Sequence, residues 1–82
     1  MGRKELAEEI VDFFIEYNLM ENSDTTITKQ RIEAHLEHSW FVEYLIHIVL
    51  VRAKYIRNMD KDRLEKILTE LEKLRFDVEY TQ

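Results

Sequence analysis

The segment SWFVEYLIHIVLVRAKYIR, residues 39–57, decides the fold class of this chain. Its apolar side chains point nearly all round a helix of 3.6 residues per turn, and only Glu43, His47 and Lys54 share a narrow polar strip. The apolar run from Trp40 to Val51 is much shorter than the roughly 20 residues that a membrane-spanning helix needs. We therefore expect a helix that is buried within a soluble all-α protein.

The residues before this segment predict a shorter helix over about 27–38, which threonine hydroxyls at its start can cap. Its few apolar residues include Ile32 and Leu36. In one continuous helix over 28–57, these two would lie on the same side as the polar strip of the second half. That change of phase favours a break near His38 and Ser39, although a single helix whose halves face different neighbours stays possible.

The N-terminal part predicts a helix over about 4–20 that is apolar over most of its circumference. A helix that packs on one side of a small core needs a narrower apolar stripe than this one has. We expect it to be covered on two sides. One stripe is Leu6, Ile10, Phe13, Phe14, Tyr17 and Met20, and the neighbouring stripe is Ala7, Val11, Ile15 and Leu19.

The C-terminal part predicts a helix over about 61–78, with Asp60 as its N-cap. Leu64, Leu71 and Val78 are seven residues apart, as are Ile67 and Leu74. Two heptads of this kind are fewer than the three or four that indicate a free-standing coiled coil. The pattern favours an ordinary bundle helix.

Composition limits what else the chain can be. It has 82 residues, 12 Lys and Arg against 17 Asp and Glu, and a formal net charge of −5. There is no Cys, no Pro and one Gly, which excludes disulfides and thiolate zinc sites and removes the usual helix breakers. We expect one domain over 1–82, a compact bundle of three to four helices. We see no targeting segment and expect a cytoplasmic location.

The predicted helices carry more apolar surface than so short a bundle can hide. We therefore expect a homodimer that shares its core through the helices at 4–20 and 39–57, the alternative being a monomer whose tails fold back over the excess. The residues that we expect to mediate self-association are Val11, Phe13, Phe14, Ile15, Tyr17, Trp40, Phe41 and Tyr44.

Five carboxylates share the remaining arc of the first helix, and we expect this acidic arc to bind a basic protein partner. A solvated helix face is the plainer interpretation of the same pattern. The acidic arc consists of Glu5, Glu8, Glu9, Asp12 and Glu16.

Catalysis and metal binding are not expected. His35 and His38 lie three apart and Glu43 and His47 four apart, but the two pairs cannot converge unless the chain breaks between them. There is no glycine-rich loop to hold a phosphate and no nucleophile with a neighbouring base. We expect no cofactor and no small-molecule substrate.

Binding to DNA is the alternative function. The run Thr26–Arg31, followed by a short helix, is similar to the start of a helix-turn-helix reading helix, with Lys29, Gln30 and Arg31 as the contacts. The net negative charge and the acids that follow in the same helix oppose it. The sequence thus favours a small, non-catalytic interaction or regulatory module that acts as a helical homodimer.

Overall fold

The computed structural model describes residues 1–20 and 25–81 and is all-helical over these ranges, with no strand. The four helices are α1 (Arg3–Glu16), α2 (Thr25–His35), α3 (Ser39–Ala53) and α4 (Lys61–Thr81). Residues 21–24, which belong to the polar stretch between the first two predicted helices, lie outside the described residues.

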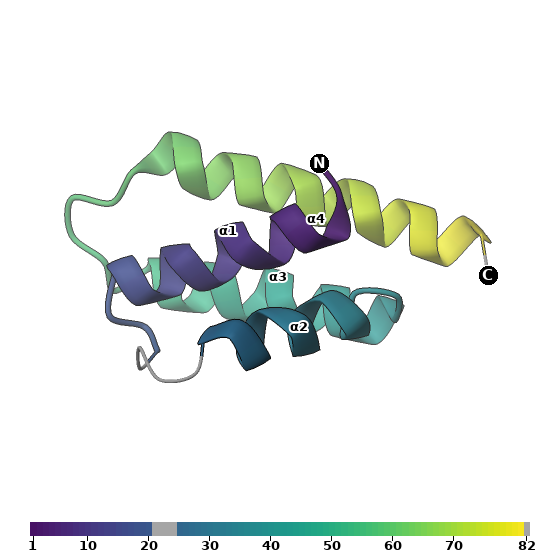
Figure 1. Cartoon of the computed structure of the whole chain (residues 1–82). Coiled ribbons are helices and arrows are strands. Elements are labelled where there is room, and N and C mark those ends of the chain that lie inside the picture. Colours follow the sequence, from purple (N-terminus) through teal and green to yellow (C-terminus); the bar gives the residue numbers. More distant parts are fainter. Residues whose placement is uncertain (21–24, 82) are drawn as a thin grey trace.

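Consecutive helices run in opposite directions and form one compact globule (Figure 1). The α1 helix packs against α2 on one side and α4 on another, while α3 packs mainly along α4. The longest helix, α4, extends past the start of α1 at its C-terminal end. Because α1 touches neighbours on two sides, it is the central helix, as its two apolar stripes predict.

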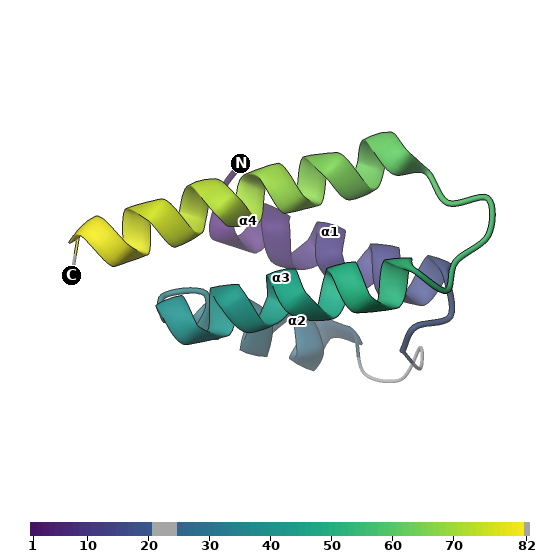
Figure 2. The ribbon, with the colours of Figure 1, turned by 180° about the vertical axis from the view of Figure 1, so that it is seen from behind.

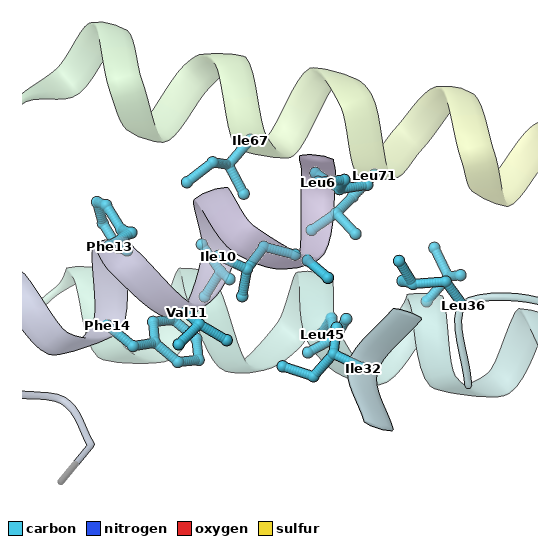
Figure 3. Packing of buried hydrophobic residues seen from close by; sticks show 13 residues of the cluster. Leu6, Ile10, Val11, Phe13, Phe14, Ile32, Leu36, Leu45, Ile67 and Leu71 are labelled. Carbon is cyan, nitrogen blue, oxygen red and sulfur yellow. The ribbon is translucent and has the colours of Figure 1, made fainter. Parts of the chain in front are cut away.

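The core is entirely apolar: no polar or charged side chain is buried among the described residues. Figure 3 shows α1 side chains meeting those of the other three helices. Nearly half of the core residues come from α1, which agrees with its central place. The core consists of Leu6, Ala7, Ile10, Val11, Phe13, Phe14, Ile32, Leu36, Val42, Leu45, Val49, Ile67 and Leu71.

The first helix ends at Glu16, four residues before the predicted boundary at Met20. Asn18 takes a left-handed conformation with φ of 58°. The Asn18 N–H donates to the carbonyl of Ile15, and the Leu19 N–H donates to the carbonyl of Phe14. This pair of bonds is a Schellman motif, in which asparagine occupies the place usually held by glycine.

The third helix also ends earlier than predicted, at Ala53 rather than Arg57. The Tyr55 and Ile56 N–H groups donate to the carbonyls of Arg52 and Ala53, which continues the chain as tight turns. Asn58 then takes a left-handed conformation with φ of 55°.

A break separates α2 from α3, so the alternative of one helix over 28–57 is excluded. His38 is the N-cap of α3, with an extended backbone at φ −102° and ψ 126°. Its carbonyl accepts the N–H groups of Phe41 and Val42. The break falls where the apolar phase changes. The second helix, predicted over 27–38, begins two residues earlier at Thr25 and ends three residues earlier at His35.

The last helix begins at Lys61, where the Arg63 N–H donates to Asp60 Oδ1 at 3.1 Å, as expected of an N-cap. Ile67 and Leu71 of the heptad seam are fully buried against the other helices. The side chain of Val78, the last seam position, lies outside the described part of the chain. The seam therefore packs within one chain, and α4 continues to Thr81.

Candidate interaction surface

The self-association residues predicted on α1 need correction, because three of them lie in the core of a single chain. Val11 and Phe13 are completely buried and Phe14 nearly so. The α2 and α4 helices cover both stripes of α1. The sequence predicts more apolar surface on α1 than one chain can bury, but neighbouring helices of the same chain cover both stripes.

Two further α1 candidates also contact their own chain. Ile15 is half-buried and packs against the core. The Tyr17 ring lies 5.0 Å from the Phe13 ring, centroid to centroid, and its hydroxyl accepts the Asp60 N–H at 2.8 Å. Tyr17 thus joins the end of α1 to the start of α4, which is a structural role.

On α3, by contrast, large apolar side chains remain exposed on the face directed away from the core. At 100° per residue, Trp40, Tyr44, His47 and Val51 fall within an arc of about 60°, and all four are exposed. We call these four residues, with Tyr55 just beyond the helix, the outer face of α3. The buried residues of α3, which are Val42, Leu45 and Val49, lie on the opposite side.

In Figure 2, α3 lies toward the viewer and no other helix crosses in front of it. Trp40, Tyr44 and Tyr55 are 62%, 54% and 84% exposed. Because a buried aromatic residue covers roughly 150–250 Å², these three present on the order of 400 Å² of ring surface. That area is comparable to the largest apolar patch of a typical monomeric protein, which is often a functional surface.

Five aromatic or imidazole rings cluster where α2 meets α3, at the N-terminal end of the outer face. We call this cluster the ring corner. The indole of Trp40 stacks on His38 with centroids 6.0 Å apart and meets Phe41 edge-on at 5.6 Å. His35 lies 5.4 Å from Phe41, which lies 6.3 Å from Tyr44. Phe41 itself is half-buried and packs against the core, so it anchors the corner.

The predicted self-association residues lack three members of the outer face, His47, Val51 and Tyr55. Val51 follows Tyr44 by seven residues and Trp40 by eleven, spacings that return to the same side of a helix. The spacing is visible in the sequence, but it identifies an exposed face only once the structure shows that the other side of α3 is buried.

The predicted acidic arc is largely engaged within the chain. Asp12 pairs with Lys29 of α2 at 3.1 Å, and Arg63 of α4 pairs with Glu16 and lies 3.9 Å from Glu9. These ion pairs join α1 to both of its neighbours. Glu5 is exposed and Glu8 half-exposed at the start of the same arc.

The predicted DNA contacts do not form a basic surface. Lys29 is held by Asp12, and it lines a small groove between α1 and α2 together with Lys4 and two acids, Glu8 and Glu33. Gln30 and Arg31 are exposed on α2. Carboxylates beside a cation repel phosphate, so this arrangement does not favour nucleic acid.

The histidines do not assemble a metal centre. The ring centroids of His35 and His38 lie 6.3 Å apart, and His38 lies 3.5 Å from Glu37. Within residues 1–20 and 25–81, no group of three or more His, Asp or Glu side chains is arranged to hold a metal ion.

Comparison with known proteins adds no relative: no family model, no curated protein and no solved structure matches this chain. Over the described ranges, none of the helices has both the length and the apolar character that crossing a bilayer requires.

Proposed function

We propose that this chain is a small, non-catalytic interaction module that forms a homodimer through the outer face of α3. The observation that carries the proposal is the exposure of three large aromatic side chains, Trp40 and Tyr44 on the side of α3 opposite the core and Tyr55 just beyond its end. In a chain this short, burial of these rings against a second copy adds apolar contact that one copy lacks.

The chemistry of the face suits protein contact. It is aromatic and aliphatic, with His47 as its one polar member in the helix, and charged side chains stand at its edges rather than its centre. Depletion of charge and enrichment of aromatic residues distinguish the cores of interfaces from the remaining surface. In a two-fold dimer, the same face of each copy packs against that face of the other copy, so a single face per chain is sufficient. The acidic arc of α1 is not part of this proposed interface. A cytoplasmic location remains a prediction.

The single tryptophan of the chain makes this proposal measurable, because Trp40 belongs to the face. In a dilution series, we expect its fluorescence maximum to lie at shorter wavelength at high protein concentration and to move to longer wavelength on dilution. The Tyr44→Glu variant places a charge at the centre of the face and is expected to give the long-wavelength maximum at every concentration.

The matched control is Gln30→Glu, which adds the same charge at an exposed position of α2 and is expected to follow the wild type. Circular dichroism of each variant verifies that the helices are intact. A wild-type maximum that is independent of concentration, at the position of the Tyr44→Glu variant, would contradict the proposal.

A further inference from the structure

Two opposite charges border the outer face of α3 on the same flank. Glu43 and Lys54 lie roughly 20° apart around the helix axis but eleven residues, or about 16 Å, apart along it. Both side chains are exposed. Neither forms an ion pair within the described part of the chain. The flank is therefore acidic near one end and basic near the other.

A flank with this charge order complements its own reversed copy. When two helices pack antiparallel about a two-fold axis, each flank lies against the same flank of the other helix, running in the opposite direction. An axis between His47 and Ile48 places residue i opposite residue 95 − i, which brings Tyr44 opposite Val51 and sets Trp40 near the turn that carries Tyr55. In this register Glu43 lies within about one helical turn of Lys54 of the second copy, twice per dimer.

We propose that the second copy docks antiparallel, α3 against α3, with the two-fold axis between His47 and Ile48 and with Glu43 of each copy paired to Lys54 of the other. This arrangement rests on the homodimer proposed above and specifies its geometry. Complementary charges at the border of an apolar interface fix its register and disfavour other pairings.

A parallel pair of α3 helices lacks this complementarity. There, each flank meets the opposite flank at the same height, so Glu43 faces the side that carries Phe41 and Ile48. No cation lies at that level. In a parallel pair, each residue also faces the identical residue of the other copy, so Trp40 lies against Trp40 and Val51 against Val51. The charge order thus selects the antiparallel form.

A charge exchange tests the register. Glu43→Lys alone and Lys54→Glu alone each set like charges opposite each other at two places, and we expect the dimer dissociation constant to rise roughly tenfold at low ionic strength. The double variant, Glu43→Lys with Lys54→Glu, restores both pairs and is expected to return to the wild-type value. Because the two positions are too far apart to pair within one helix, this rescue can only arise between copies.

Engineered cysteines provide a second readout, since the chain contains no cysteine of its own. In the antiparallel register, Tyr44→Cys chains mixed with Val51→Cys chains are expected to cross-link to each other under oxidation, while each variant alone remains mostly uncross-linked. Gln30→Cys mixed with Val51→Cys serves as the control for random collision.

The outcomes separate the register from the dimer itself. Failure of the double charge variant to rescue, or cross-linking of each cysteine variant with itself, overturns the antiparallel register while leaving the dimer intact. A wild-type chain that does not dimerise at all refutes both proposals.

Discussion

Two asparagines take a left-handed conformation in a chain without internal glycine or proline, Asn18 at the end of α1 and Asn58 in the turn between α3 and α4. Asn18 and Asn58 both adopt φ near +55°, a conformation that costs an ordinary side chain roughly 1 kcal/mol. We predict that Asn18→Gly stabilises the fold by about 0.5 kcal/mol and that Asn18→Ala destabilises it by about 1 kcal/mol. The free energy of urea-induced unfolding measures both.

The control for this prediction is Gln30→Gly, at an exposed position within α2. Glycine inside a helix lowers its stability by about 1 kcal/mol, so the same new residue is expected to act in opposite directions at the two positions. Destabilisation by Asn18→Gly equal to that of Gln30→Gly would show that Asn18 is not left-handed.

Arg63 connects α4 to α1 through three contacts. Its guanidinium pairs with Glu16 and Glu9 and lies 5.8 Å from the centroid of the Phe13 ring. We predict that Arg63→Ala lowers the free energy of unfolding by about 1 kcal/mol, and by less in high salt because the ion pairs are partly exposed. Urea unfolding at two salt concentrations measures the effect.

Lys66→Ala, at an exposed position one turn further along α4, is the matched control and is expected to change stability by less than about 0.5 kcal/mol. If the two variants changed stability equally, the structural role assigned to Arg63 would be wrong.

At the scale of elements, α1 and α3 are both rich in apolar residues but use them differently. Phe13 of α1 is fully buried, whereas Trp40 of α3 is 62% exposed. We predict that Phe13→Ala costs about 3–5 kcal/mol of stability, because it leaves a cavity in the core. Trp40→Ala is expected to cost less than about 1 kcal/mol in the dilute, monomeric protein.

Thermal unfolding of both variants in dilute solution, followed by circular dichroism, makes the comparison. A loss of stability from Trp40→Ala as large as that from Phe13→Ala would mean that the indole belongs to the core of a single chain.

Periodicity predicted the elements of this fold well, and local chemistry predicted some of their ends. The change of apolar phase near Ser39 predicted the break between α2 and α3, and Asp60 was recognised as a cap. The early end of α1 at Asn18 is hard to predict, because asparagine is only an occasional left-handed cap. The early end of α3 at Ala53 has no such cap, since Lys54 keeps a right-handed conformation.

The distribution of buried faces was harder to predict. The segment at 39–57 is the most apolar, yet α1 is the central helix and α3 leaves one face uncovered. Periodicity reports which residues share a face but not which faces meet, because that depends on how helices far apart in the sequence pack together.

At the scale of the whole molecule, 82 residues can form only a modest core, so the proposed second copy is expected to contribute noticeably to stability. We predict that the wild-type unfolding midpoint rises with protein concentration, because dissociation and unfolding are then coupled. The Tyr44→Glu variant is expected to unfold at a midpoint that does not depend on concentration. A wild-type midpoint that is likewise constant would speak against dimerisation.

The molar mass in solution tests most directly whether the outer face of α3 packs against a second copy of the chain. Light scattering on a size-exclusion column is expected to give twice the 10.0 kDa mass of one chain for the wild type at high micromolar concentration. The Tyr44→Glu variant is expected to elute at the single-chain mass. A wild-type mass of 10.0 kDa at that concentration would contradict the account.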